Sequence, residues 1–165
     1  MSFGPKGERA RLQVLGRLPF ALWMWKTLPL AAFAGLRVVR LDAQACSVSL
    51  PGGWRTQNPF RSTYFAAQAM AAEMSTGAPA LVLLEDAKAS VAMLVVALSV
   101  TYTKKLVGEG VFTFGDVAGM KAAIDRAAAS DLPQAFVARP LGRDRSGEAV
   151  AEFEITWSFK RRSRS

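Results

Sequence analysis

The segment from 58 to 77, NPFRSTYFAAQAMAAEMSTG, carries one acidic residue, Glu73, in a run rich in alanine and methionine. On a helix, the residues that share its face are small or flexible: Ala66, Ala69, Met70 and Gly77. Small neighbours leave room beside the carboxylate, and their low polarity disfavours its charged form. A carboxylate whose pKa is raised in this way is suited to act as a general base near neutral pH.

The same segment also allows structural interpretations. A buried Glu73 can bond a Ser, Thr, Arg or backbone group across a dimer interface, or it can lie exposed towards the end of the helix. Asn58, directly before Pro59, is typical of a helix N-cap as well as of a site residue. Ser62 and Thr63 fit first-turn hydroxyl groups as well as ligands for a substrate.

The absence of histidine narrows the chemistry, because all 165 residues include none. Ser-His-Asp and Cys-His catalysis and histidine-based metal sites are therefore excluded, and we expect no metal. Acid–base work falls to Asp, Glu, Lys, Tyr or a bound water. The single cysteine, Cys46, forms no internal disulfide, and we interpret it as a small core residue rather than a nucleophile.

The net charge of +8 is concentrated at the two ends of the chain. Residues 1–40 carry seven Lys or Arg and one Glu, and residues 160–165 carry four more basic residues. The middle, 41–159, has ten basic and twelve acidic residues. Because no basic face is interleaved with aromatic residues, this distribution favours solvated ends over a nucleic-acid partner.

The first 35 residues form a separate lead-in that allows three interpretations. Pro19, Lys26 and Pro29 interrupt the apolar run 16–36, which disfavours both a membrane span and a signal peptide. Apolar residues at helical spacing predict an amphipathic helix packed on the domain: Leu18, Leu22, Trp25, Leu28 and Ala32. A cleaved signal peptide and an interfacial membrane helix remain the alternatives.

The rest of the chain predicts strands around one helix. Strands are expected over 36–50, 80–86, 91–102 (its first half covered on both faces) and 107–115, and a final strand with alternate residues buried, Phe153 to Phe159. Gly77 and Pro79 predict the end of the apolar helix, Asp116 predicts a later helix that ends near Ser130, and Glu85 with Asp86 predicts a solvated turn. The fold class is α+β, with an antiparallel sheet wrapped around a central helix, an N-terminal helix and a helical insertion between late strands.

Several motifs carry a family resemblance over residues 36–160. They are Asn58, Ser62, the pair Tyr64 and Phe65, Glu73 and Gly77, followed by the turn DRSGEAVAEFEITW at 144–157. In order and spacing they resemble a largely uncharacterised thioesterase-like family of hotdog-fold proteins, related to acyl-coenzyme A thioesterases of the phenylacetate-pathway type. The remaining residues, 161–165, form a basic tail. Two positions depart from the family pattern, since Pro59 stands where histidine is usual and Arg61 where glycine is usual.

The resemblance implies a catalytic role for Glu73, as base or nucleophile towards a thioester, with Asn58 as a positioning group. It implies that the first turn of the helix offers backbone N–H groups to the developing oxyanion. Arg61, Ser62, Thr63 and Lys104 would contact the substrate, and the basic side chains would meet the phosphates of coenzyme A, although solvated surface charge is an alternative for Lys104.

We therefore expect a cytoplasmic acyl-coenzyme A thioesterase that needs no cofactor beyond the coenzyme A of its substrate. The family also implies a homodimer or a dimer of dimers, with sites at the subunit boundary. Two alternatives stay open: a non-catalytic hotdog module that binds an acyl chain or only dimerises, and a membrane-associated or exported protein. The departures at Pro59 and Arg61 favour the first alternative, and the apolar N-terminal run favours the second.

Overall fold

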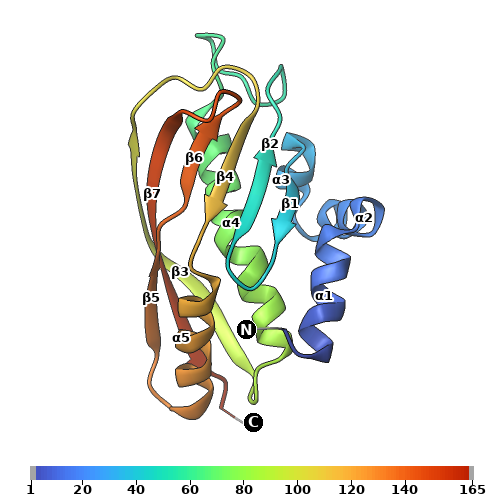
Figure 1. The fold of residues 1–165 in the computed structure, drawn as a ribbon, viewed down its shortest axis with the longest axis vertical. Helices are drawn as coiled ribbons and strands as arrows, with labels where there is room; N and C mark the ends of the chain where they lie inside the picture. Colours follow the sequence, from blue (N-terminus) through green and yellow to red (C-terminus); the bar gives the residue numbers. More distant parts are fainter. Residues whose placement is uncertain (1–2, 164–165) are drawn as a thin grey trace.

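The computed structural model describes residues 3–163 and shows an antiparallel sheet wrapped around a long helix (Figure 1). The helices are α1 (Pro5–Leu15), α2 (Arg17–Thr27), α3 (Pro29–Ala34), α4 (Phe65–Glu85) and α5 (Val117–Ala129). The strands are β1 (Arg37–Leu41), β2 (Cys46–Leu50), β3 (Val91–Tyr102), β4 (Gly110–Phe114), β5 (Gln134–Ala138), β6 (Leu141–Asp144) and β7 (Ala149–Arg161). Residues 1–2 and 164–165, the outer ends of the predicted lead-in and basic tail, lie outside the described residues.

The sheet is antiparallel throughout and has the strand order β1-β2-β4-β6-β7-β3. The long strand β7 pairs with β3 along one edge, and on its other edge it pairs first with β6 and then with β5. The sheet curls around α4, which confirms the predicted antiparallel sheet and central helix (Figure 1). The insertion α5 packs against β5, β7 and α4.

The central helix begins and ends further along the chain than the sequence predicts, and it is longer. It begins at Phe65 rather than near Asn58, and it runs through Gly77 and Pro79 to Glu85, so the strand predicted over 80–86 is wrong. Pro79 removes one helical hydrogen bond, which normally disfavours a helix interior. Here the sheet together with α1 and α5 buries the segment on most sides, and burial of its apolar side chains outweighs the local stop signals.

The strand predictions are correct for β7 and incomplete elsewhere. Phe153, Ile155, Trp157 and Phe159 are buried while Glu152 and Glu154 are exposed, as the alternation predicts. The predicted strand over 36–50 is a hairpin of β1 and β2, because the Asp42 carboxylate accepts hydrogen bonds from the N–H groups of Gln44 and Ala45 and closes a turn.

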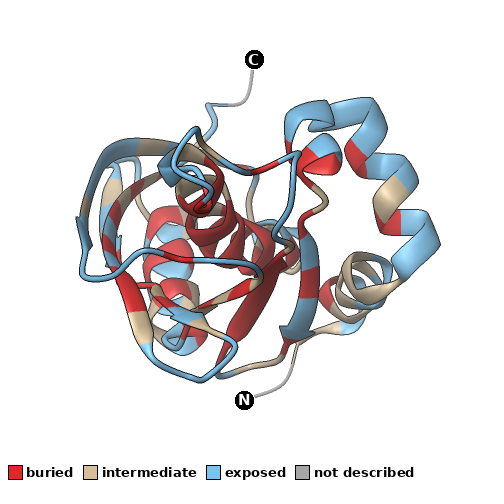
Figure 2. Ribbon diagram, turned by 90° about the horizontal axis from the view of Figure 1, so that it is seen from above, coloured by how far each residue is buried: buried red, intermediate tan, exposed pale blue. Residues whose placement is uncertain are grey.

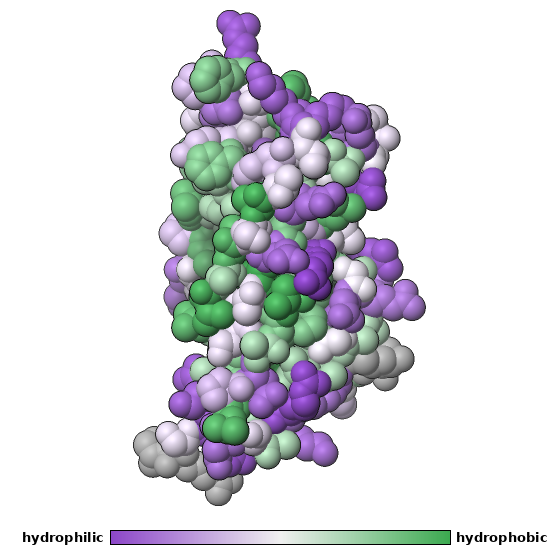
Figure 3. All heavy atoms as spheres, turned by 90° about the vertical axis from the view of Figure 1, so that its left-hand side faces the viewer, coloured by the Kyte–Doolittle hydropathy of each residue, from purple (hydrophilic) through white to green (hydrophobic). Residues whose placement is uncertain are grey.

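Strand β3 is an edge strand, which corrects the prediction that its first half is covered on both faces. Leu94 is 65% exposed and Val96 is 54% exposed. The strand bulges between Val95 and Ala97, so that Leu98, Val100 and Tyr102 face the same side as their β7 partners Ile155, Phe153 and Ala151. Figure 3 shows the outer surface on the left-hand side of Figure 1, where apolar residues gather in the middle of the face.

The N-terminal region forms three short helices that border one side of the domain (Figures 1 and 2). The predicted buried stripe is wrong for four of its five residues, because Leu18, Leu22, Trp25 and Leu28 are exposed. Ala32 is buried as predicted, and in α2 Phe20 and Met24 are the buried residues. Breaks at Gly16 and Leu28 divide the region into separate helices, so one continuous helical stripe never forms. No helix within residues 3–163 is long and apolar enough to cross a membrane.

Asp86 ties the end of α4 to the start of α1 instead of lying in a solvated turn. Its carboxylate accepts hydrogen bonds from the N–H groups of Gly4 and Gly7 at 2.7 and 2.9 Å. A β-carbon on Gly7 would come within 2.1 Å of the same carboxylate, so only glycine allows this approach.

The prediction that Cys46 is a core residue is confirmed, since it is fully buried and burial raises the pKa of its thiol. Asp116 caps α5 through the N–H of Gly119, as predicted.

Candidate functional site

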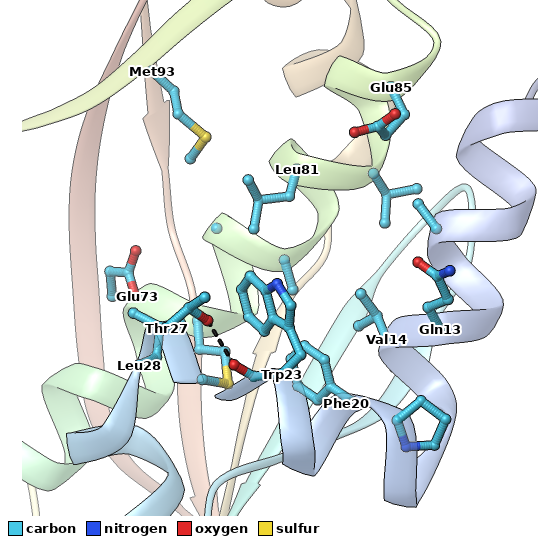
Figure 4. Close-up of a pocket in the computed structure, with 16 residues that line it drawn as sticks. Gln13, Val14, Phe20, Trp23, Thr27, Leu28, Glu73, Leu81, Glu85 and Met93 are labelled. Atoms are coloured by element: carbon cyan, nitrogen blue, oxygen red, sulfur yellow. Dashed lines mark hydrogen bonds between the residues drawn. The ribbon is translucent and has the colours of Figure 1, made fainter. Parts of the chain in front are cut away.

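Glu73 lies in a groove of about 680 Å³ between α4 and the N-terminal helices (Figure 4). One wall is a single face of α4, which presents Glu73, Gly77 and Leu81 to the groove. The opposite wall comes from α2, where Phe20 and Trp23 stack with ring centroids 5.5 Å apart. The groove is therefore a mostly apolar space with a carboxylate at each end, Glu73 and Glu85, which is the general form of a site for a small organic ligand.

Burial changes the acidity of Glu73. The side chain is partly buried, and the loss of solvent raises the pKa of its carboxyl group above the ordinary value of 4.5. Within residues 3–163 neither side-chain oxygen of Glu73 has a hydrogen-bond or ion-pair partner. A half-buried acid without such a partner is poised to take up a proton, which is the property required of a general base.

Two residues that the sequence analysis missed fix the helix turn behind Glu73. Thr76 donates a hydrogen bond through Oγ1 to the Glu73 carbonyl at 2.8 Å and accepts one from Trp157 Nε1 at 2.9 Å. Both of these side chains are buried, so this hydrogen bond joins α4 to β7 inside the core. The sequence carries one signal for the pair: Trp157 stands on the inward face of an alternating strand, where its N–H needs an acceptor.

Asn58 organises a tight loop before α4 and is not the cap of that helix. Its side-chain oxygen lies 3.0 Å from the N–H of Phe60 and 3.2 Å from the N–H of Ser62. Its amide nitrogen donates to Ser62 Oγ at 3.0 Å. The N-cap position of α4 belongs to Tyr64, six residues further on. The prediction of an N-cap at Asn58 is wrong because the chain first makes this loop.

The loop places Arg61 in the left-handed region, with φ at +57°. Arg61 is the one non-glycine residue with positive φ among residues 3–163. This conformation is one that glycine adopts without penalty and that costs other residues about 1 kcal/mol. Arg61 is exposed, so its guanidinium group is free to reach a ligand outside the loop. The glycine usual at this position in the resembling family fits the backbone conformation observed here.

Ser62 and Thr63, predicted as ligands or first-turn hydroxyl groups, are buried and already hydrogen-bonded. Ser62 bonds the Asn58 side chain, and Thr63 Oγ1 donates to the Gly108 carbonyl at 3.2 Å. The N–H of Thr63 donates to the Leu106 carbonyl at 2.8 Å. These contacts join the loop to the segment after β3, so both residues support the loop in this structure.

Lys104 lies apart from the groove. Its ammonium group contacts Glu148 and stands 3.2 Å from Asp144 Oδ2. Hydrogen bonds from Ser146 and Lys104 lower the pKa of Asp144 to about 2. Two carboxylates already neutralise Lys104, so the arrangement does not favour a phosphate contact by this residue.

The predicted site residues other than Lys104 therefore lie in two places. Glu73 lines the groove, whereas Asn58, Arg61, Ser62 and Thr63 form the loop before α4 and are not part of the groove lining. Glu73 stands eight residues after the start of α4, about 12 Å along its axis at 1.5 Å per residue. Within a single subunit, Glu73 is therefore separated from the loop before α4.

The sequence identifies the family. Residues 16–159 match the model of the domain of unknown function DUF4442, and the chain belongs to this family. No curated protein is similar in sequence to the chain.

Solved structures share the fold at low sequence identity. A protein of unknown function from Pseudomonas aeruginosa, described as a probable thioesterase, is 18% identical with a TM-score of 0.71, over 98% of this chain and 100% of that one. A thioesterase from Haemophilus influenzae is 10% identical with a TM-score of 0.65, over 88% and 91%. A thioesterase from Staphylococcus aureus, solved with a glutamine replaced by alanine, is 12% identical with a TM-score of 0.62, over 81% and 99%. The same staphylococcal protein was also solved with a glutamate replaced by alanine.

Proposed function

We propose that this protein is a hotdog-fold hydrolase of acyl thioesters, with coenzyme A as the acyl carrier, and that Glu73 is its catalytic carboxylate. The observation that carries the proposal is the position of Glu73 in a mostly apolar groove, where its carboxyl group has a raised pKa and, among residues 3–163, no hydrogen-bond or ion-pair partner. The thioesterase names of the structural neighbours support the reaction class. The two residues replaced in the staphylococcal thioesterase are fifteen positions apart, the same spacing as from Asn58 to Glu73.

In the proposed reaction Glu73 accepts a proton from water while the water oxygen bonds to the acyl carbon. The tetrahedral intermediate then collapses, the carbon–sulfur bond breaks, and the proton passes from Glu73 to the leaving thiolate. The products are a carboxylic acid and a free thiol, and the carboxylate is regenerated. Direct attack by Glu73 on the acyl carbon, followed by hydrolysis of the resulting anhydride, would use the same side chain.

The loop before α4 has the second role in this proposal. Asn58 holds the loop in its shape and thereby positions the exposed Arg61 guanidinium to meet a phosphate of the carrier. Because the loop and Glu73 stand apart within one subunit, we propose that a two-fold dimer brings the loop of one subunit to Glu73 of the other. Such a site lies at the subunit boundary and is incomplete in a single chain.

Strand β3 supports a dimer. It is twelve residues long, it pairs with β7 on one side, and residues 3–163 provide no strand for its other side. A long unpaired edge with exposed apolar residues such as Leu94 and Val96 favours pairing with a second copy. Antiparallel pairing of two β3 strands would extend the sheet across the dimer.

One further observation supports the membrane-associated alternative as an additional property. Leu22 is 66% exposed and Trp25 is 57% exposed on α2, where Arg17 and Lys26 are also exposed. Residues 9–41 contain six basic residues and no acidic residue. Tryptophan, leucine and basic side chains on one surface helix are typical of contact with anionic lipid. We propose a cytoplasmic enzyme that associates reversibly with such a surface.

The proposal is tested by hydrolysis of a panel of acyl-coenzyme A esters by the wild-type protein and the Glu73→Gln variant. Hydrolysis that depends on Glu73 is expected. Absence of hydrolysis by the wild-type protein would favour a non-catalytic acyl-binding or dimerisation module.

A further inference from the structure

The groove that contains Glu73 has a defined length and two polar ends. Four residues of α4 at intervals of four line it: Glu73, Gly77, Leu81 and Glu85. At 1.5 Å per residue, positions 73 and 85 stand about 18 Å apart along the helix axis. Figure 4 shows them at opposite ends of the groove, with Leu81 between them. Gln13 of α1 also lines the groove on the side of Glu85.

Between these ends the groove is apolar. The wall formed by α4 is apolar here, and none of its side chains carries a charge or a hydrogen-bonding group: Met74, Gly77, Ala78, Leu81 and Val82. Facing them, Trp23 points towards Leu81 (Figure 4). Leu81 is 43% exposed and Trp23 is 40% exposed, so both large apolar side chains keep accessible surface inside the groove. Covering that surface with an apolar ligand is favourable.

We infer that the groove binds the acyl chain of the substrate, with the thioester at Glu73 and the terminal methyl group short of Glu85, and that it selects chains of medium length. The inference rests on the proposed function, which supplies the thioester at Glu73. The apolar part of the groove is shorter than the roughly 18 Å between positions 73 and 85 of the α4 wall. Its length matches an extended chain of about eight to twelve carbons. A shorter chain leaves Leu81 and Trp23 uncovered. A longer chain pushes methylene groups against the Glu85 carboxylate and Gln13, which are then desolvated without a partner.

Binding of S-alkyl coenzyme A thioethers tests the inference, because these compounds keep the sulfur and the carrier but cannot be hydrolysed. Calorimetry on the full-length protein would compare chains of four, eight, twelve and sixteen carbons. The expected affinity rises from four to about ten carbons by up to about fourfold for each methylene group, and then stops rising or falls at sixteen. Equal affinity for all four lengths would overturn the inference, and so would a continued rise to sixteen.

Two variants locate the chain within the groove. Glu85→Leu should tighten binding of the sixteen-carbon thioether by about tenfold and leave the four-carbon compound unchanged, because it removes the polar end. Leu81→Trp should block the middle of the groove and weaken the twelve-carbon compound while sparing the four-carbon one. The matched control is Glu152→Leu, an exposed acid on β7 outside the groove. Identical behaviour of Glu85→Leu and Glu152→Leu would overturn the placement of the chain end.

The thioether experiment also separates this inference from the proposed hydrolysis. If thioether binding depended on chain length but no acyl-coenzyme A ester were hydrolysed, the proposed hydrolase function would be wrong. The assignment of the groove as an acyl-chain site would still hold. If all esters of the panel were hydrolysed but thioether binding did not depend on chain length, the hydrolase function would stand. The assignment of the groove as the acyl-chain site would then be wrong.

Discussion

The carboxylate of Glu73 lies over the bare α-carbon of Gly77, one helical turn further along α4. A β-carbon at position 77 would stand 2.9 Å from Glu73 Oε1, closer than side chains normally approach. Alanine is favoured over glycine in a helix interior by about 1 kcal/mol. Glycine at this position therefore keeps space for the acid at a cost in helix stability.

Gly77→Ala is expected to separate activity from stability. The added methyl group displaces the Glu73 carboxylate, and we expect kcat/KM for thioester hydrolysis to fall about tenfold or more, since a small misplacement of a catalytic group is costly. The free energy of unfolding, measured with urea, should stay the same or rise by up to about 1 kcal/mol. Gly115→Ala is the control, because a β-carbon there meets nothing within 4 Å. Unchanged kcat/KM in Gly77→Ala would contradict the account.

The raised pKa of Glu73 predicts a pH-dependent stability difference. Burial makes the folded protein hold this proton more tightly than the unfolded chain, whose ordinary value is 4.5. The stabilising effect is complete below that value and is lost as the pH rises through the raised pKa. Glu73→Gln cannot ionise, so its free energy of unfolding relative to wild type should increase between about pH 4 and pH 8. Urea titrations at both ends of this range check the sign, with Glu152→Gln as an exposed control. An equal difference at both ends would refute it.

The exposed edge of β3 predicts that the protein is a dimer. It also predicts that a charged residue introduced on this edge dissociates the dimer into monomers. Leu94→Lys places an ammonium group on the edge strand, and charged residues at such edges oppose pairing. Sedimentation velocity should show a dimer for the wild type and a monomer for Leu94→Lys. Leu132→Lys, at a residue exposed to a similar extent outside the sheet, should remain a dimer. A monomeric wild-type protein would exclude the two-subunit site.

The apolar and basic surface of α2 predicts binding to anionic vesicles. Phosphatidylglycerol vesicles should pellet the wild-type protein at low salt, and neutral phosphatidylcholine vesicles should not. The double change Leu22→Glu with Trp25→Glu should abolish pelleting, whereas Leu132→Glu should leave it intact. If the double variant instead changed only the oligomeric state, α2 would be assigned to a contact between copies of the chain.

The sequence predicts best where one pattern decides the structure. The alternation from Phe153 to Phe159 indicates a half-buried strand, and β7 has that burial pattern. Asp116 before an amphipathic run indicates a capped helix, and α5 begins there. The raised pKa of Glu73 could be predicted from the sequence only for a buried helix, and the structure buries this side chain far enough to raise that pKa.

Prediction fails where tertiary contacts override local signals. Gly77 and Pro79 predict a helix end, yet packing against the sheet, α1 and α5 keeps the segment helical to Glu85. The spacing of Leu18, Leu22 and Trp25 indicates a buried stripe, but Phe20 and Met24 face the domain instead. Periodicity shows that apolar residues share a face and leaves open which face the rest of the chain covers. The groove combines α1, α2, α4 and the start of β3, so no local pattern could reveal it.

If the carboxylate of Glu73 performs thioester hydrolysis, its loss must lower kcat/KM for a medium-chain acyl-coenzyme A ester. We expect Glu73→Gln, folded and dimeric like the wild type, to lose about 10²–10⁴-fold in kcat/KM, the usual contribution of a general base. We also expect wild-type activity to rise with pH through the raised pKa of Glu73. Equal kcat/KM in the wild type and Glu73→Gln would show that Glu73 is not the catalytic carboxylate.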